Sequence, residues 1–217
     1  MTELLLIRHG QANAEAADEA GYDRLSPLGY DQARWLGDWL RGTGVSYDRF
    51  IHGSLRRHRE TAAGLGIVNQ AEEDPRWNEI SYYILSAAYE ELHGRSAPDK
   101  PEDFADYFAG LMEVWAADAL PGAPESHSDF TGRVLAALAE EAARGGRAVI
   151  VTSGGVIGTV VAAALGLSPD GMARLTVAIE NTAMQRLAWR GGRWRLLEYG
   201  ACPHLATPDR AHARTFV

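Results

Sequence analysis

The tripeptide Arg8-His9-Gly10 directly follows an apolar run, residues 4–7, that is typical of a buried strand. A guanidinium beside an imidazole can hold an anion and attack it, because neutral imidazole is a nucleophile that needs no metal. Gly10 would let the backbone approach the anion, since it has no side chain. A surface ion pair at Arg8 and a structural turn histidine at His9 are the alternative interpretation of the tripeptide alone.

Arginines gather at a second place, where Arg56, Arg57 and Arg59 follow a strand predicted over residues 47–52. Ser54 is predicted to cap the helix that begins there. The N-terminus of a helix favours anions through its free N–H groups and its dipole, so we expect one of these arginines to point into a crevice. Solvation of all three on the outer face of the helix is the alternative.

Strands and helices alternate along most of the chain. A helix is predicted from Ser26 and Pro27 to about Gly42, and a β-prone run over residues 147–152 is followed by Ser153-Gly154-Gly155 and another helix. Further strands are predicted over residues 175–179, 182–189 and 194–199, with a hairpin turn at 190–193. This order predicts an α/β fold, a three-layer sandwich with a mainly parallel mixed sheet flanked by helices on both faces.

The strands and helices that must position these side chains are expected to form one domain, residues 1–217. Ligands of such sheets bind at the carboxyl ends of the strands, so the junctions at Arg8, Ser54 and Ser153 should face one crevice. Residues 81–123 depart from the pattern, with helical stretches near 84–92 and 102–120. We interpret them as a helical insertion that covers the substrate.

Composition excludes several classes of function. The net charge of −8 gives no reason to expect nucleic-acid or membrane binding, so an anion site must be a local cluster of Arg and His. Cys202 is the only cysteine, which excludes an internal disulfide. The N-terminus does not resemble a signal peptide, and the apolar stretch at residues 156–167 is too short to span a bilayer. We therefore expect a soluble, cytoplasmic protein.

Six segments together resemble the histidine phosphatase superfamily, the phosphoglycerate-mutase-like proteins. They match the family's motifs in its order, from the opening strand to the closing strands, and cover about residues 2–204. The segments are residues 4–11, 25–33, 53–62, 76–79, 149–157 and 181–183. Each match is weak by itself, whereas their order is specific. The match is weakest over residues 81–123.

The resemblance implies roles for individual residues. His9 matches the nucleophile that is transiently phosphorylated, and Arg57 matches a second phosphate-binding arginine beside Arg8. Glu79 matches the proton donor to the leaving alcohol. Arg8, Arg57, Ser153, Gly10 and Gln11 are thus the expected phosphate-binding set. The family's mechanism uses no cofactor and no metal, and its ligands are phosphorylated small molecules and inorganic phosphate.

The sequence departs from the family at the last catalytic turn. Ser153-Gly154 stands where the family has His-Gly, and a serine hydroxyl offers one neutral hydrogen bond instead of an imidazole. Loss of one such donor costs about 10²–10³ in rate. Gly53, His58 and Glu60 also stand where the family often has Ser, Ala and Gln. We expect a phosphatase acting on a small-molecule phosphomonoester, and a pseudophosphatase that only binds phosphorylated ligands is the alternative.

The remaining histidines lack clear motif support, and the sequence shows no pattern for other chemistries. His127, near a predicted helix start, could supply a replacement imidazole, although a polar role at the helix start is more usual. Structural or surface roles are expected for the remaining candidates, His52, His93, His204 and His212. Walker, Gly-x-Gly-x-x-Gly and Gly-x-Ser-x-Gly motifs are absent, and the acidic residues lack metal-ligand spacing.

Two properties stay open at the level of the sequence. Residues 80–84 lack the glycine and the later Glu-Gly of mutase-like members, so a phosphoglycerate mutase is not favoured, but the substrate is not identified. Oligomeric state is equally open, with a homodimer compatible with the sequence.

Overall fold

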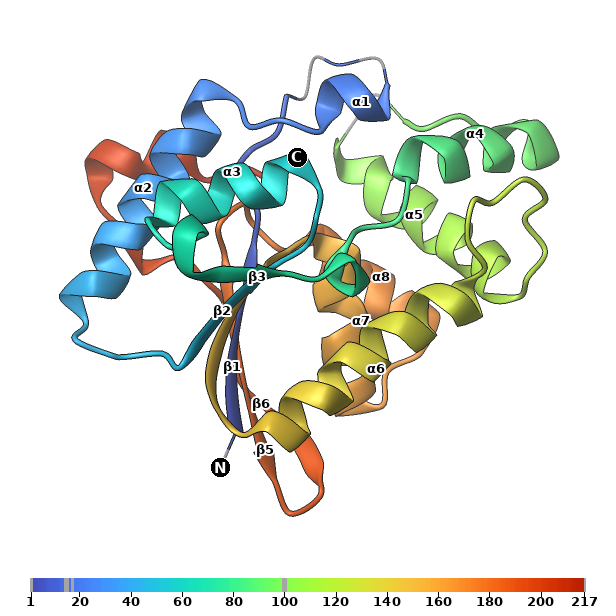
Figure 1. Cartoon of the computed structure of the whole chain (residues 1–217). Helices are drawn as coiled ribbons and strands as arrows, with labels where there is room; N and C mark the ends of the chain where they lie inside the picture. Colours follow the sequence, from blue (N-terminus) through green and yellow to red (C-terminus); the bar gives the residue numbers. More distant parts are fainter. Residues whose placement is uncertain (1, 14–15, 17, 99–100, 217) are drawn as a thin grey trace.

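A six-stranded sheet forms the centre of the computed structural model, which describes residues 2–13, 16, 18–98 and 101–216 (Figure 1). The strand order is β3-β2-β4-β1-β5-β6. The first four of these strands run parallel, and β5 and β6 form an antiparallel hairpin on one side. The strands are β1 (Thr2–Arg8), β2 (Arg49–His52), β3 (Ala71–Glu73), β4 (Gly146–Thr152), β5 (Met184–Arg190) and β6 (Arg193–Ala201). The predicted mainly parallel mixed sheet is confirmed.

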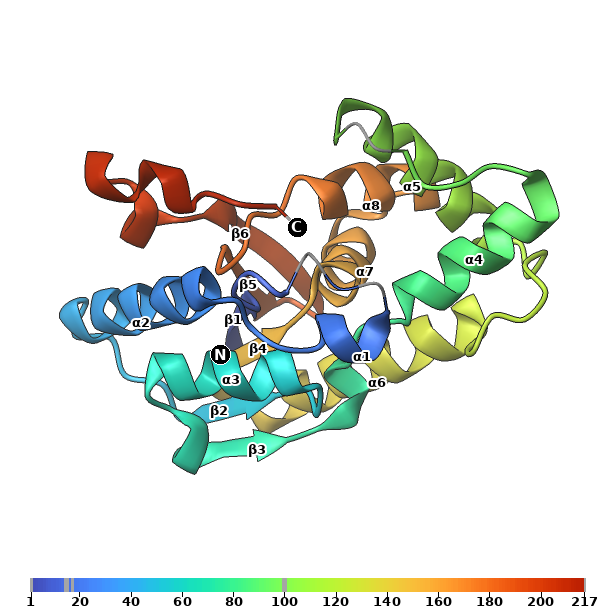
Figure 2. The ribbon, with the colours of Figure 1, turned by 90° about the horizontal axis from the view of Figure 1, so that it is seen from above.

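Helices cover both faces of this sheet, as the view from above shows (Figure 2). Two helices, α2 (Pro27–Gly42) and α3 (Arg56–Leu65), lie on one face, and α6 (His127–Arg144) and α7 (Gly154–Leu165) lie on the other. Side chains of β1 alternate between them: Leu5 and Ile7 pack toward α2 and α3, whereas Leu4 and Leu6 join the larger opposite cluster. The three-layer sandwich expected from the sequence is therefore present.

Serine side chains begin several of these helices. Ser26, Ser126 and the N-cap serine of α8 (Pro169–Val177), Ser168, each accept a hydrogen bond from the first turn. Ser54 does not, contrary to our prediction. The N-cap of α3 is Leu55, and the Asp23 carboxylate instead accepts from the N–H groups at the start of the helix, 2.9 and 3.1 Å away.

The segment predicted as an insertion contains α4 (Tyr82–His93) and α5 (Pro101–Ala116), close to the predicted helical stretches. The strand predicted over residues 175–179 is wrong, because that segment completes α8 and the turn after it. Pro169 at the first helical position and buried Met172, Ala173 and Thr176 at helical spacing explain the helix. The short helices of the described chain are α1 (Glu19–Tyr22), η1 (Val68–Gln70), η2 (Pro75–Trp77), η3 (Pro203–Leu205) and η4 (Pro208–Ala213).

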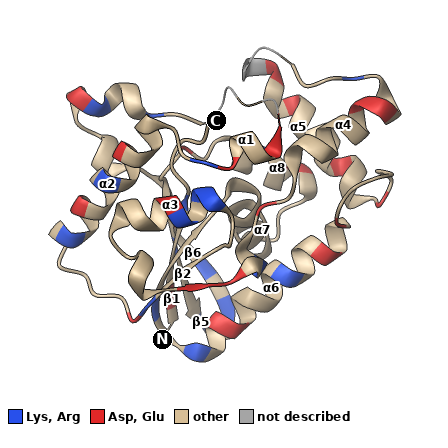
Figure 3. Cartoon of the chain, turned by 45° about the horizontal axis from the view of Figure 1, so that its top comes forward, with Lys and Arg blue, Asp and Glu red and all other residues tan. Residues whose placement is uncertain are grey.

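Basic and acidic residues are scattered over the ribbon, with a basic segment at the start of α3 near the upper end of the sheet (Figure 3). Among the described helices, none is both long and apolar enough to cross a membrane. The start of α3 is where the sequence predicted an anion-binding arginine.

Candidate active site

A cavity of about 760 Å³ opens at the carboxyl ends of β1 and β4. Four residues singled out from the sequence line it together: Arg8, His9, Arg57 and Glu79. Arg8 ends β1, Arg57 lies in the first turn of α3 and Glu79 follows η2, so three separate segments converge. The expectation that strand-to-helix junctions face one crevice is met by Arg8, by Arg57 and by Gly154-Gly155 after β4.

One ring nitrogen of His9 makes a hydrogen bond to the backbone, which fixes the tautomer of the ring. Its Nδ1 lies 2.7 Å from the carbonyl oxygen of Gly10, so Nδ1 carries the proton and Nε2 keeps its lone pair. Burial, then the charges of Arg57 and Arg8, hold the pKa of His9 well below its ordinary value. The imidazole is therefore neutral and nucleophilic at Nε2.

Arg8 and Arg57 are buried, and each has an N–H donor without a hydrogen-bond partner among the described residues. Arg8 donates from Nη1 to the carbonyl of Ile179, and Arg57 Nη1 contacts the carboxylates of Glu19 at 3.3 Å and Asp23 at 3.0 Å. Within the described part of the chain, the buried Nε atoms of both arginines have no hydrogen-bond partner. Unpaired buried donors are costly, and an anion in the cavity would satisfy them.

Glu79 is fixed by two backbone amides. One carboxylate oxygen accepts from the N–H of Ile80 at 3.0 Å, and the other accepts from the N–H of Gly155 at 2.8 Å. A methyl group on Gly155 would overlap the Glu79 carboxylate in this position, so the glycine allows the carboxylate to approach the start of α7 closely. The first turn of α7 thus aims this carboxylate at the site.

Gly10 and Gln11 serve the site differently from what the sequence suggested. A Cβ on Gly10 would lie 2.5 Å from the carbonyl oxygen of Gly29, so the glycine permits packing on α2. The N–H of Gly10 donates to Thr61, and Gln11 bonds to Gln32 and Ser26. Neither Gly10 nor Gln11 lines the cavity. Both residues brace the loop that carries His9.

Ser153 does not line the cavity either, but it has a partner that the sequence did not assign to it. Its hydroxyl lies 2.6 Å from Nε2 of His58, which is completely buried in α3. The rings of His58 and His9 are 5.8 Å apart. A signal was present in the sequence, because His58 and Ser153 both depart from the family pattern; nothing in the sequence showed that they meet.

The other histidines do not line the cavity. His127 packs edge-on against Trp115, with ring centroids 5.0 Å apart, so the replacement imidazole considered from the sequence is not found there. His204 bonds to Thr182, and His52 donates from Nδ1 to the carbonyl of Gly53. His93 and His212 are exposed.

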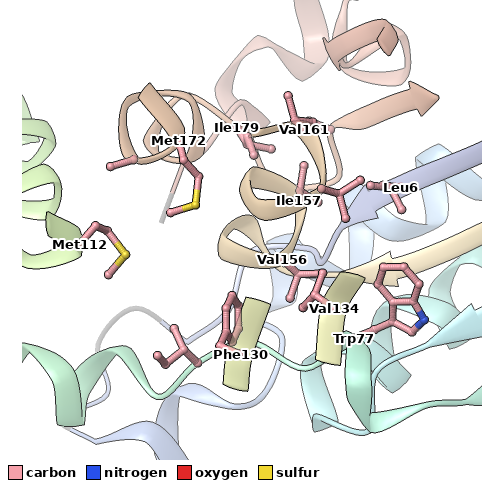
Figure 4. Packing of buried hydrophobic residues seen from close by; sticks show 14 of the residues in the cluster. Leu6, Trp77, Met112, Phe130, Val134, Val156, Ile157, Val161, Met172 and Ile179 are labelled. Carbon is pink, nitrogen blue, oxygen red and sulfur yellow. The ribbon is translucent and has the colours of Figure 1, made fainter. Parts of the chain in front are cut away.

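The rest of the cavity is mainly apolar. Met112, Phe130 and Met172 extend from α5, α6 and α8 toward a common space (Figure 4). The described lining contains Arg8 and Arg57 as its only Lys or Arg side chains. Aromatic side chains dominate the remainder: Tyr22, Tyr82, Tyr83, Phe104, Phe108, Trp115 and Phe216. The site therefore joins a polar end, which carries the two arginines, to an apolar, partly aromatic one.

A neutral imidazole near two guanidiniums, at the strand ends of an α/β sandwich, can attack a phosphoryl group that the guanidiniums hold. The chain belongs to the histidine phosphatase superfamily (branch 1), whose family model matches residues 4–201. This membership confirms the resemblance drawn from the ordered motifs.

Relatives within the family carry the names of both mutases and phosphatases. A 2,3-bisphosphoglycerate-dependent phosphoglycerate mutase of Methylorubrum populi is 28% identical over 194 residues, 85% of this chain and 89% of the mutase. A broad-specificity phosphatase of Saccharomyces cerevisiae is 29% identical over 136 residues, 54% of this chain and 59% of the phosphatase.

Solved structures share the fold. A phosphoserine phosphatase mutant of Entamoeba histolytica, in complex with phosphoserine, matches with a TM-score of 0.70 and 20% identity, covering 94% of this chain and 100% of that one. A mycobacterial glucosyl-3-phosphoglycerate phosphatase in complex with inorganic phosphate matches with a TM-score of 0.65 and 24% identity, covering 94% of this chain and 99% of that one.

Proposed function

We propose that the chain is a phosphatase that hydrolyses small-molecule phosphomonoesters through a phosphohistidine at His9. The convergence of His9, Arg8, Arg57 and Glu79 on one cavity carries this proposal. Nε2 of His9 attacks phosphorus while the arginines hold the phosphoryl oxygens. The bond from phosphorus to the ester oxygen breaks, and the carboxylic acid of Glu79 gives its proton to that oxygen, which leaves as an alcohol.

A second displacement returns the enzyme to its starting state. Water attacks the phosphohistidine, and the Glu79 carboxylate takes one of its protons. The bond between phosphorus and Nε2 breaks, so His9 is again neutral and inorganic phosphate is the product. Every proton in the two steps is exchanged with Glu79, and both steps balance without a metal ion. We therefore expect chelation by EDTA to leave the rate unchanged, and a rate lost to EDTA and restored by a divalent cation would contradict this part.

The cavity favours hydrolysis over a phosphoglycerate mutase reaction. A mutase must hold the carboxylate of phosphoglycerate as well as its phosphoryl group. The described lining offers no Lys or Arg besides Arg8 and Arg57 for that second anion. The aromatic end instead suits an uncharged, bulky alcohol, since burial of such a group contributes about 1.5–3 kcal/mol. We expect kcat/KM for naphthyl phosphate to exceed that for 3-phosphoglycerate by about tenfold or more.

Covalent labelling tests the phosphohistidine directly. Wild-type protein is mixed with a ³²P-labelled aryl phosphate, quenched in base and digested, and we expect acid-labile label on the peptide that contains His9. His9→Gln should abolish both labelling and phosphate release, while His93→Gln, a change at an exposed histidine, should alter neither. Tight binding of phosphomonoesters with no label and no turnover would instead identify a pseudophosphatase.

Glu79 is tested by varying the leaving group. Glu79→Gln keeps the size of the side chain but cannot give a proton, so the loss should depend on how much the leaving oxygen needs one. We expect a loss of about 10²–10⁴ in the labelling rate for an alkyl phosphate and a much smaller loss for p-nitrophenyl phosphate. Equal losses for the two substrates would exclude the role of general acid.

A further inference from the structure

His58 and Ser153 form a buried polar pair that links α3 to the end of β4. Nε2 of His58 lies 2.6 Å from the Ser153 hydroxyl, and the two residues are 0% and 1% exposed. Desolvation of both polar groups is unfavourable, and the hydrogen bond between them offsets part of that free energy. The two residues are 95 positions apart in the sequence, so only the fold brings them into contact.

The surroundings are shaped to admit this imidazole. A methyl group on Gly53 would overlap Nδ1 of His58 and would also lie 2.7 Å from Oδ1 of Asn78 and 2.9 Å from the carbonyl oxygen of Trp77, so the glycine makes room for the ring and for residues 77 and 78. Gly53, His58 and Ser153 are three of the departures noted in the sequence, and all three meet here. A change at one of them alone would leave a clash or an unpaired polar group.

The pair lies beside the proposed nucleophile. In the sheet, Arg8 pairs with Thr152, and the N–H of His9 donates to the Thr152 carbonyl at 2.8 Å, so His9 and Ser153 follow neighbouring parallel strands. The His58 ring lies 5.8 Å from the His9 ring. His58 thus lies against both the Ser153 hydroxyl and the His9 ring, and of these three residues only His9 lines the cavity.

The Ser153 hydroxyl is not used to cap its helix. Ser153 is the N-cap residue of α7, yet its side chain accepts no hydrogen bond from the first turn. Ser26, Ser126 and Ser168 are the N-cap residues of other helices, and each of their side chains accepts a hydrogen bond from the first turn. The usual role of an N-cap serine therefore does not explain Ser153.

The hydrogen-bond direction follows from the buried ring. Burial, with the charge of Arg57 and the neighbouring His9 and His52, holds the pKa of His58 well below its ordinary value, so the ring carries one proton. Nδ1 has no partner in the described chain. A buried N–H without an acceptor is rare, so the proton belongs on Nε2, which donates to Ser153 Oγ. The hydroxyl proton of Ser153 is then left for another acceptor.

We propose that Ser153 donates a hydrogen bond to the phosphoryl group during its transfer to and from His9, and that His58 is the positioning residue that orients this hydroxyl. The inference rests on the proposed function and deepens it. Two residues from different elements would thereby supply the donor that a single histidine at position 153 would supply. The chain from Nε2–H through O–H to the phosphoryl oxygen is polarised along its length, which strengthens the final bond.

The position of Ser153 predicts which kinetic constant changes. Ser153 is beside His9 but does not line the cavity that receives the substrate, so its bond should form mainly as phosphorus reaches Nε2. Removing it should lower kcat and leave KM nearly unchanged. We expect Ser153→Ala to lower kcat by about 10²–10³, the loss typical of one such donor. Ser168→Ala is the matched control, because that hydroxyl only caps α8, and its kcat should not change.

Variants of His58 test the positioning role. His58→Ala should also lower kcat, and because His58 acts through Ser153, the double variant His58→Ala/Ser153→Ala should be no slower than Ser153→Ala. His58→Gln retains an N–H donor and should recover part of the activity lost in His58→Ala. Losses that multiply in the double variant, or an unchanged kcat in Ser153→Ala, would overturn the proposal.

Moving the imidazole from position 58 to position 153 gives a second test. Ser153→His alone places two imidazoles in one space and should lower activity, whereas His58→Ala/Ser153→His should exceed both single variants. Histidine ring ¹⁵N spectra add a readout that does not need turnover, since they should show the proton of His58 on Nε2. A proton on Nδ1, or a double variant no better than Ser153→His, counts against the pair.

The outcomes separate this proposal from the proposed function. Orthovanadate, an analogue of the transferring phosphoryl group, is titrated into each variant by calorimetry. If wild-type protein labels at His9 while Ser153→Ala labels equally fast, only the pair is refuted. If wild-type protein neither labels nor turns over, the proposed function is refuted, and the pair stands only if Ser153→Ala still weakens vanadate binding by about tenfold or more relative to Ser168→Ala.

Discussion

At the scale of single residues, the groups around His9 keep its ring uncharged. The two arginines that attract a phosphoryl group also repel a proton from the imidazole, and burial acts in the same direction. The bond from Nδ1 to the Gly10 carbonyl then leaves the lone pair on Nε2. In the proposed mechanism, one arrangement would therefore both bind the phosphoryl group and keep the imidazole neutral.

This predicts an unusual titration for His9. Its pKa is lowered, so the ring should stay neutral as pH falls through about 6.5, the range in which ordinary histidines gain a proton. The charged and titratable neighbours are Arg57, Arg8 and His58, and Arg57 makes the larger charge contribution. Arg57→Gln should therefore move the pKa of His9 upward. Ring ¹⁵N shifts, assigned with His9→Gln, measure both values, and a wild-type midpoint near 6.5 would contradict the argument.

The sequence predicted the residues of the site better than their partners. Arg8, His9, Arg57 and Glu79 were placed by motif and order, and the cavity brings them together. The bond between His58 and Ser153 could not be predicted, because it joins α3 to the end of β4, 95 positions apart in the sequence, and has no local pattern. Gln11 was assigned to phosphate binding by the motif, whereas its side chain bonds to Ser26 at the start of α2.

At the scale of elements, the segment around α1 positions the Arg57 side chain. Asp23 accepts from the N–H groups of Arg56 and Arg57 and from the Arg57 side chain, so it replaces the missing N-cap of α3 and fixes the guanidinium. The sequence predicted α3 itself from its pattern. It could not predict this cap, because Asp23 belongs to a segment more than thirty residues away in the chain.

Two carboxylates on the same guanidinium should have opposite roles. Asp23→Ala removes a cap and a buried bond, so it should destabilise the protein by about 1–2 kcal/mol and weaken phosphate binding. Glu19 lines the cavity and competes with the anion for Arg57. Glu19→Gln should therefore tighten binding of inorganic phosphate by several-fold, equivalent to about 1 kcal/mol. Urea unfolding and product inhibition measure the two effects, and weaker phosphate binding in both variants would disprove competition by Glu19.

At the scale of the whole molecule, a buried turn connects the loop that carries His9 to the C-terminal part of the chain. Thr182, with a φ of 59°, donates its N–H to the carbonyls of Arg8 and His9, and its hydroxyl donates to the carbonyl of Asn181. Since that hydroxyl proton is committed, His204 must donate from Nε2 to Thr182 Oγ. The loop carrying His9 is thus supported by a neutral histidine from η3, which is the structural one of the two roles, structural or surface, expected for His204 from the sequence.

This support predicts that acid destabilises the fold before it protonates His9. Burial lowers the pKa of His204 from 6.5 to about 4, so between these values the unfolded chain binds a proton that the folded protein does not. Stability from this group is therefore complete above the unfolded pKa and is lost as pH falls, by about 2 kcal/mol between about pH 7.5 and about pH 5. His204→Gln can still donate to Thr182 but does not titrate, so urea unfolding should show a smaller loss over that interval than in wild-type protein, with exposed His93→Gln as the control. The lowered pKa values of His9 and His58 also reduce stability as pH falls, but they do so equally in every variant, so the comparison isolates His204. An equal loss of stability in His204→Gln and in wild-type protein would show that this histidine does not control acid stability.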